Sequence, residues 1–257
     1  MFQNRQQNKK ALITFIVSGD PSIETTEELI LAMVEAGADS VEIGIPCADP
    51  VADGPVIQAS NKRALANGTT ADQVFEMLVR VRRKVQIPLI LMAYLDTIYT
   101  YGKERFLSAC RDSGINGIII VPDMSFDEQS ELPATCAQFG IDFISKVAPF
   151  SDEKIAMIAK KAKGFLYCAS SLGVTGTQSG NNADIERVVA QARKFTDIPC
   201  LIGFGISNPD QAKAMATISD GVMVGSAIVK MIEEHGNDCI EPVKTFTRAL
   251  KEAIESV

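Results

Sequence analysis

The sequence is poor in histidine and lacks the paired-cysteine motifs that usually bind zinc. Its 257 residues include no tryptophan and a single histidine, and the six cysteines form no Cys-x-x-Cys pair. This spacing argues against a zinc site, and a disulfide framework is not expected at this length. Cys168 and Cys200 lie in apolar runs and are interpreted as small buried hydrophobic residues. The expected compartment is the cytoplasm.

Long apolar segments and positive charge are also scarce. No run approaches the ~20 apolar residues that a membrane span needs. The first apolar run, Ala11–Val17, ends at Ser18-Gly19-Asp20-Pro21 without a small-residue cleavage site, so it is interpreted as a buried strand rather than a signal segment. The formal net charge is −7, which argues against a general nucleic-acid or anionic-membrane surface. A local pocket for a small anion stays possible.

What the sequence does contain is a regular alternation of short apolar runs and amphipathic stretches. The runs are β-branched and apolar at consecutive positions, as in parallel strands covered on both faces. The stretches between them carry helix-start signals at Ser22, Thr70, Ser125 and Ser207-Asn208. The expected strands are Ala11–Val17, Ser40–Ile45, Leu89–Ala93, Gly117–Val121, Asp142–Val147, Gly164–Cys168, Cys200–Gly203 and Gly221–Val224.

Eight strand–helix units in this length predict an α/β fold, a single (β/α)8 TIM barrel. A doubly wound sheet is the alternative, but it seldom needs eight units of such even size. No Gly/Ser/Pro-rich linker divides the chain, so one domain is expected over residues 1–257.

The second expected strand carries a candidate catalytic acid. Val41, Ile43 and Ile45 alternate with smaller or polar residues and are expected to face the helices, which places Glu42 inside the barrel. A buried carboxyl is unfavourable unless it is paired or protonated. Local hydrogen bonding could satisfy it, but at the carboxyl end of a barrel strand a catalytic acid with a raised pKa is the favoured interpretation.

The loop after this strand contains two more acids, Asp49 and Asp53, and three prolines. Proline restricts the backbone, so the loop can hold a carboxylate above the barrel mouth. Turn chemistry explains Asp49 before Pro50 well. Asp53 before Gly54 is equally consistent with a turn or with catalysis, and we expect it to lie nearer to water than Glu42.

Glycine-rich loops follow three of the later strands. Gly203 to Ser207 and Gly225 to Ala227 follow strands seven and eight, where barrel enzymes bind phosphate through backbone N–H groups and a helix N-terminus. The segment 170–182 is long and polar, and is interpreted as a lid whose Thr175 and Gly176 add donors to the phosphate site.

Two further residues need an interpretation. His235 stands near a helix end before Gly236 and is interpreted as a surface residue. Lys146 alternates with the apolar pattern of strand five, so a class I aldolase mechanism with a Schiff-base lysine stays a minor alternative.

Several of these motifs together resemble one enzyme family. The block Val41 to Pro46, running into Asp49 to Pro55, looks like the signature of the tryptophan synthase alpha subunit. The resemblance extends over nearly the whole chain. The other matching motifs are Ser18-Gly19-Asp20-Pro21, Gly173-Val174-Thr175-Gly176, Gly203-Phe204-Gly205-Ile206-Ser207 and Asp220-Gly221-Val222 to Gly225-Ser226-Ala227-Ile228-Val229.

The resemblance implies a reaction and roles for individual residues. The family cleaves indole-3-glycerol phosphate to indole and glyceraldehyde 3-phosphate, a carbon–carbon lyase reaction of tryptophan biosynthesis. Glu42 matches the family's acid/base glutamate and Asp53 its aspartate at the indole N–H. The matching substrate-binding positions are Phe15, Tyr94 and Tyr167 around the indole, Gly176, Gly205, Gly225 and Ser226 at the phosphate, and Thr175 beside the aspartate.

The resemblance also implies an assembly. The family partner is a beta subunit, in an alpha2beta2 heterotetramer, and pyridoxal phosphate is expected on that partner with no cofactor or metal on this chain. The chain departs from the usual family pattern at Cys47-Ala48, Ser125, Phe150 and Thr177-Gln178, and the N-terminal helix is short or missing.

Alternatives to this reading belong to different classes of protein. One is a self-sufficient indole-3-glycerol-phosphate lyase that needs no partner. Another is a catalytically silent barrel that binds and activates a beta subunit, against which the presence of both carboxylates argues. A generic phosphosugar isomerase on the same fold is a more distant alternative.

Overall fold

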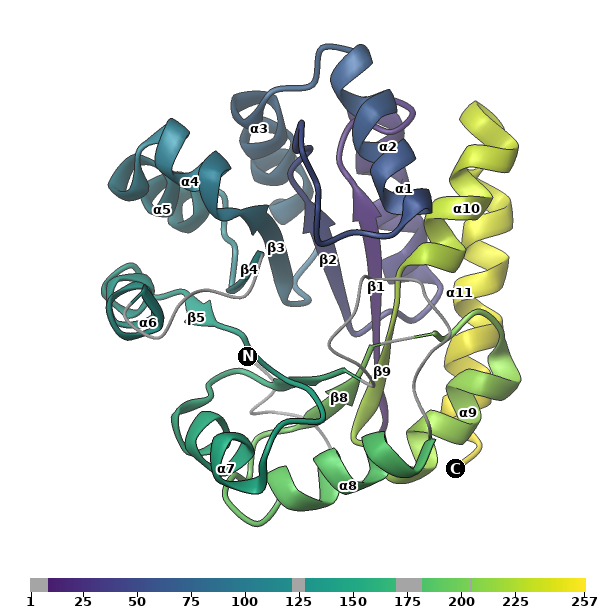
Figure 1. Cartoon of the computed structure of the whole chain (residues 1–257). Helices are drawn as coiled ribbons and strands as arrows, with labels where there is room; N and C mark the ends of the chain where they lie inside the picture. The colour runs from purple at the N-terminus through teal and green to yellow at the C-terminus, as the bar shows by residue number, and fades with distance from the viewer. Residues whose placement is uncertain (1–8, 122–127, 170–181, 204) are drawn as a thin grey trace.

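The computed structural model describes residues 9–121, 128–169, 182–203 and 205–257. Its strands form one parallel sheet with the order β5-β4-β3-β2-β1-β9-β8-β7-β6, and helices surround them (Figure 1). This confirms the predicted barrel. The strands are β1 Ala11–Val17, β2 Ser40–Gly44, β3 Leu89–Tyr94, β4 Gly117–Val121, β5 Asp142–Phe143, β6 Ser145–Val147, β7 Leu166–Cys168, β8 Cys200–Ile202 and β9 Gly221–Val224.

The helices alternate with the strands along the chain. They are α1 Ile23–Glu35, α2 Pro55–Ala66, α3 Ala71–Arg82, α4 Leu95–Tyr101, α5 Lys103–Asp112, α6 Glu128–Gln138, α7 Asp152–Lys161, α8 Asn182–Ala192, α9 Pro209–Ile218, α10 Ser226–His235, the 3-10 turn Gly236–Asp238, and α11 Ile240–Glu255. Ser22 caps α1, Thr70 forms a capping box with Gln73 at α3, and Asn208 caps α9, as the sequence predicts. The expected capping box at Ser125 lies outside the described residues.

The predicted fifth strand is correct in position but divided at Ile144. Its first part, β5, pairs with β4, and its second part, β6, pairs with β7. The chain itself therefore joins the two ends of the sheet and closes the barrel. Periodicity cannot reveal this exchange of partners, because both parts keep the same alternation of side chains.

The pairing register measures the stagger of the barrel. Following the paired residues from Phe15 through β2, β3 and β4 leads to Asp142 on β5. Following them from Ala11 in the other direction, through β9, β8 and β7, leads to Lys146 on β6, four residues further along the chain. Ala11 and Phe15 are also four residues apart, so the register shifts by eight residues around the barrel. That shear is the one expected for an eight-stranded TIM barrel. The two series are Phe15, Glu42, Ile90, Gly117, Asp142, and Ala11, Gly221, Leu201, Tyr167, Lys146.

This stagger places side chains from alternate strands at common levels inside the barrel. Ile13 and Ile90, at the lowest of the three levels, have no exposed surface, whereas Met92 at the upper level keeps 8%. The interior is therefore sealed below and accessible above, towards the carboxyl ends of the strands. The upper level holds Phe15, Met92, Lys146 and Gly203, the middle level Glu42, Ile119, Tyr167 and Met223, and the lower level Ile13, Ile90, Ile144 and Leu201.

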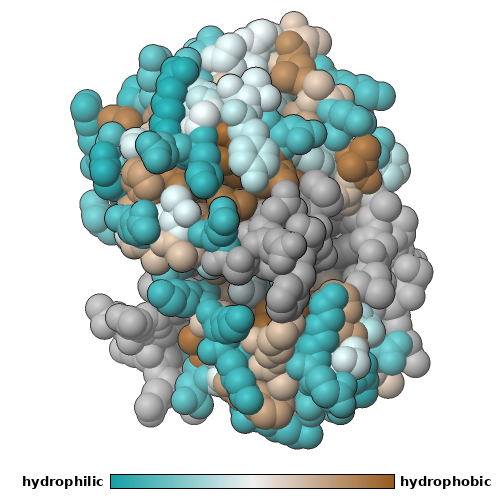
Figure 2. Space-filling view, turned by 60° about the vertical axis from the view of Figure 1, so that its left-hand side comes forward, coloured by the Kyte–Doolittle hydropathy of each residue, from teal (hydrophilic) through white to brown (hydrophobic). Residues whose placement is uncertain are grey.

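The outer faces of the strands pack against the helices. Val41, Ile43 and Ile45 belong to the cluster that contains Leu29 and Met33 of α1, as the alternation in strand two predicts. All six cysteines are free, and Cys168 and Cys200 are buried, as predicted. Among the described helices, none combines the length and apolar content of a membrane span. On the face in Figure 2, hydrophilic residues cover most of the exterior, with small hydrophobic groups between them.

Candidate active site

Glu42 lies inside the barrel, as the sequence predicts. On β2 it pairs with Phe15 of β1 and Ile90 of β3, and only 6% of its surface is exposed. Burial, together with the nearby charge of Asp53, raises the pKa of Glu42 to about 8. The carboxyl group is therefore protonated at neutral pH and can act as an acid.

Asp53 comes from the loop after β2 and lies close enough to Glu42 for its charge to act on that carboxyl group. Its side chain accepts a hydrogen bond from the hydroxyl of Tyr94, with an O–O distance of 3.1 Å. The same hydroxyl accepts one from the N–H of Ala52 at 3.1 Å, which fixes the loop against β3. Burial, followed by the charge of Asp53, raises the pKa of Tyr94, so the phenol stays a donor.

The expectation that Asp53 lies nearer to water is wrong. Asp53 is 2% exposed, less than Glu42, whereas Asp49 on the same loop is exposed. The reason is that the loop folds back against Tyr94 instead of projecting from the mouth. The Tyr94 hydroxyl, rather than bulk solvent, provides a hydrogen bond to the carboxyl group of Asp53.

Helix α2 positions this loop through residues that sequence reasoning missed. The side-chain oxygen of Asn61 accepts a hydrogen bond from the N–H of Cys47 at 2.7 Å, and its amide donates to Ile57 O at 2.9 Å. Gln58 donates to the carbonyl of Asp53 at 2.8 Å. Gln58 and Asn61 are three residues apart and so share one helix face, which was the available signal.

The same helix also holds the loop after β1. Arg63 donates to both carboxylate oxygens of the buried Asp20, at 2.9 and 2.7 Å, and Ser60 donates to Asp20 at 2.5 Å. Arg63 also pairs with Glu233 of α10 at 2.7 Å. Helix α2 thus connects both loops with the helix that follows β9.

Phe15 and Tyr167, the expected indole-pocket residues, lie on inner faces of the barrel. Phe15 packs so closely on Gly44 and Gly225 that a Cβ at either position would come within 3.2 Å of its ring. Tyr167 donates a hydrogen bond to the carbonyl of Gly203 at 2.5 Å and leaves no room there for any side chain. Tyr167 therefore requires glycine at position 203, whereas a side chain at position 44 or 225 would have to displace the ring of Phe15 slightly.

Three of the expected phosphate residues, Gly205, Gly225 and Ser226, follow the carboxyl ends of the neighbouring strands β8 and β9. Gly225 precedes α10 and Ser226 begins it, and in the described structure no side chain caps this helix. Its first N–H groups are therefore oriented as an anion site requires. Gly205 has a φ of +69°, a conformation that favours glycine. Thr175 and Gly176 lie outside the described residues.

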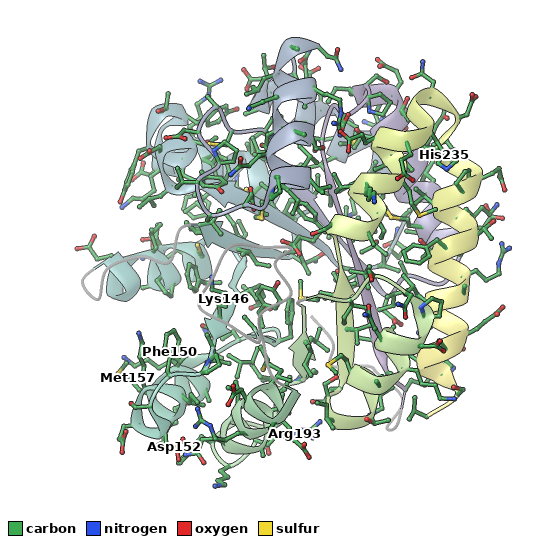
Figure 3. The ribbon with its side chains drawn as sticks, turned by 45° about the vertical axis from the view of Figure 1, so that its right-hand side comes forward. Lys146, Phe150, Asp152, Met157, Arg193 and His235 are labelled. Carbon is green, nitrogen blue, oxygen red and sulfur yellow. The ribbon has the colours of Figure 1, made fainter. Side chains whose placement is uncertain are left out.

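The remaining candidates fall into two groups. Lys146 pairs with Tyr167 on the inner side of the barrel, whereas His235 is exposed at the end of α10, as predicted (Figure 3).

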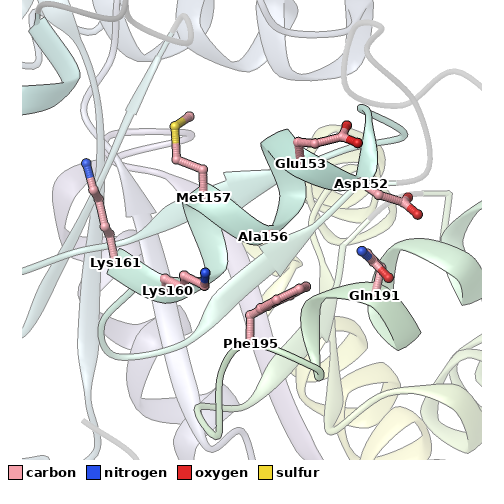
Figure 4. A pocket seen from close by; sticks show the side chains of 8 residues that line it. All are labelled: Asp152, Glu153, Ala156, Met157, Lys160, Lys161, Gln191 and Phe195. Carbon is pink, nitrogen blue, oxygen red and sulfur yellow. The ribbon is translucent and has the colours of Figure 1, made fainter.

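A groove between α7 and α8, which includes Met157 and Phe195, lies on the outer surface (Figure 4). Within the described part of the chain, no three histidine, cysteine or acidic side chains gather as a metal site would require.

The barrel, its two interior carboxyl groups and the uncapped helix after β9 define a barrel enzyme for a phosphorylated substrate. The sequence profile of the family described as "Tryptophan synthase alpha chain" matches residues 1–256, and the chain belongs to that family. The family cleaves indole-3-glycerol phosphate in tryptophan biosynthesis, a carbon–carbon lyase reaction.

Individual relatives match over nearly the full length. The tryptophan synthase alpha chain of Alkaliphilus metalliredigens is 43% identical over 250 residues, covering 96% of this chain and 94% of the relative. The crystal structure of the alpha subunit from Legionella pneumophila has a TM-score of 0.88 at 31% identity, covering 97% and 94% of the two chains. A tryptophan synthase structure from M. tuberculosis, in an aminoacrylate-bound form, matches with a TM-score of 0.84 at 27% identity, covering 96% and 94%.

Proposed function

We propose that Glu42 and Asp53 carry out the cleavage of indole-3-glycerol phosphate in this chain. The observation that carries the proposal is a buried glutamate with a raised pKa beside a buried aspartate that receives a hydrogen bond from Tyr94. Two carboxyl groups with different protonation states can divide acid and base roles between them.

The proposed steps balance in protons. Glu42 gives its proton to indole C3 while Asp53 accepts the indole N–H proton. The Glu42 carboxylate then takes the proton of the adjacent glycerol hydroxyl, and the carbon–carbon bond breaks as the aldehyde forms. The bond electrons return to the ring, Asp53 returns its proton to nitrogen, and both groups end as they began. Indole and glyceraldehyde 3-phosphate leave.

The phosphate end supplies binding energy away from the reacting bond. Gly205, Gly225 and Ser226, with Thr175 and Gly176 from loop six, are proposed to hold the phosphate through backbone and hydroxyl donors. Phe15 and Tyr167 line the pocket for the indole ring, and the contact of Phe15 with Gly225 links the two ends. Binding the phosphate orients the reacting bond towards Glu42.

A beta subunit is the proposed partner, in an alpha2beta2 assembly, with pyridoxal phosphate on the partner. Two strongly exposed hydrophobic residues, Val51 at 59% and Tyr99 at 51%, lie in segments that follow β2 and β3, at the barrel mouth. Apolar groups exposed in this way are typical of protein contacts. We place the assembly in the cytoplasm and the whole chain in a single domain.

The test is indole release from indole-3-glycerol phosphate by the purified chain. Glu42→Gln and Asp53→Asn should each reduce kcat by about 100-fold or more, the scale of a lost general acid or base. Asp49→Asn, which removes an exposed acid from the same loop, is the matched control and should change kcat less than threefold. Losses below about 100-fold for both pocket variants contradict the proposed roles.

Repeating the assay with a beta subunit separates the alternatives. A rate that rises on complex formation supports the alpha-subunit assignment. Full turnover without any partner favours a self-sufficient lyase. Binding and activation of the beta subunit without indole formation favours a silent barrel.

A further inference from the structure

Lys146 is the one positively charged side chain that the described strands direct into the barrel beside the candidate active site. On β6 it alternates with Val147, which packs in the outer cluster with Ile155 and Cys168. Its partner across the ladder is Tyr167, whose ring packs against the interior cluster. Lys146 therefore faces inward. In Figure 3 it is labelled towards the centre of the molecule, whereas Asp152 and Met157 lie at the outer surface.

The register also gives its depth. Lys146 stands at the level of Phe15 and Met92, directly above the level that contains Glu42 and Tyr167. These are the levels at which the interior side chains keep some exposed surface, and Lys146 itself is half-buried. Lys146 therefore lies on the wall of the upper interior, above the more tightly closed lower level.

The position is also lower than the proposed phosphate site. Gly225 follows the last residue of β9, and Gly205 follows β8 by three residues, so both stand nearer to the mouth than Phe15 and Lys146 do. A substrate whose phosphate is held there and whose indole contacts Phe15 has its hydroxyl-bearing carbons between these points. Those carbons therefore lie between the level of the two glycines and the level of Phe15 and Lys146, and a lysine side chain is long enough to extend towards them.

We propose that Lys146 is a substrate-binding residue whose ammonium group donates hydrogen bonds to the hydroxyl oxygens of the phosphorylated three-carbon chain. The inference rests on the proposed function for the substrate class. A positively charged side chain at this position also attracts an anionic substrate. A hydrogen bond to a charged donor is strong enough to change affinity tenfold or more.

The experiment measures binding of three probes to the full chain by ligand-detected NMR: glycerol 3-phosphate, inorganic phosphate and indole. Lys146→Met should lower the affinity for glycerol 3-phosphate at least tenfold. The affinities for inorganic phosphate and for indole should change less than threefold. In the cleavage assay the same variant should raise KM for indole-3-glycerol phosphate more than it lowers kcat. Lys160→Met, on the outer face of α7 over the ring of Phe195, is the matched control.

Any one of three results overturns the inference. The variant could bind glycerol 3-phosphate with unchanged affinity, or it could lose affinity for inorganic phosphate, or for indole, as strongly as for glycerol 3-phosphate. Lys146→Gln repeats the comparison with a polar side chain if the methionine variant does not fold, as judged by circular dichroism. The proposed function fails separately. If the wild-type chain binds glycerol 3-phosphate through Lys146 but releases no indole, the lysine contact stands and the lyase assignment falls.

Discussion

Glu42 and Asp53 are both buried, and the charge of Asp53 acts on the ionisation of Glu42. Burial is the larger cause of the raised pKa of Glu42, and the charge of Asp53 is the smaller one. Asp53 accepts a hydrogen bond from the Tyr94 hydroxyl. The active site is therefore a pair of acids in which burial raises the pKa of Glu42 and the charge of Asp53 raises it further.

A titration tests this coupling. In Asp53→Asn the pKa of Glu42 should fall below about 8 but stay above the ordinary 4.5, because the burial remains. Carbon-13 NMR of the side-chain carboxyl groups measures the pKa of Glu42 in the wild type and in the variant. Glu27, whose pKa is lowered first by its hydrogen bond with Lys84 at the surface, should titrate identically in both. An unchanged pKa of Glu42 in Asp53→Asn would contradict the coupling.

The same group should make stability depend on pH. Between pH 5 and 8 the folded protein binds one proton more at Glu42 than the unfolded chain does, so this residue's contribution to the free energy of unfolding falls as pH rises. The fall is at most about 1.4 kcal/mol per pH unit. Urea unfolding at several pH values should show this slope in the wild type and its loss in Glu42→Gln. Equal slopes would mean that Glu42 is ionised in the folded protein.

At the scale of the element, α2 holds the catalytic loop. Asn61→Ala leaves the Cys47 N–H without its acceptor and should lower the free energy of unfolding by about 1–3 kcal/mol. It should also lower kcat about tenfold, because the loop that carries Asp53 loses an anchor. Lys62→Ala, exposed on the same helix, should change neither quantity. Urea unfolding and indole release measure the two effects, and a stability loss with normal kcat would limit Asn61 to a structural role.

The elements themselves were largely predictable, and the contacts between distant ones were not. Consecutive apolar residues and capping signals such as Thr70 located the strands and helices, and alternation in strand two placed Glu42 inside. The division at Ile144 and the burial of Asp53 were missed. Each depends on a segment that is distant in the sequence. The strand divides because its second part pairs with β7, and Asp53 is buried because its loop lies against Tyr94. Local periodicity carries no information about such neighbours.

At the scale of the molecule, the barrel separates stability from function along its axis. The lower interior level is closed by aliphatic side chains, while the carboxyl ends of the strands bear Glu42, the loop of Asp53 and the start of α10. The most exposed hydrophobic residues within the described chain, Val51 and Tyr99, belong to segments at this same end. A partner that covers them would lie over the mouth, where a product such as indole leaves.

Tyr99→Lys tests whether that end of the barrel is the docking surface. Tyr99 is 51% exposed on α4, so the substitution should leave the fold and the indole release of the isolated chain unchanged. It should weaken binding of a beta subunit about tenfold or more, because a charge replaces an apolar contact. Calorimetric titration measures the affinity. Met157→Lys, on the outer groove between α7 and α8, is the matched control and should bind normally (Figure 4). Normal binding by Tyr99→Lys together with weak binding by Met157→Lys would show that the partner docks on the outer helices and not at the barrel mouth.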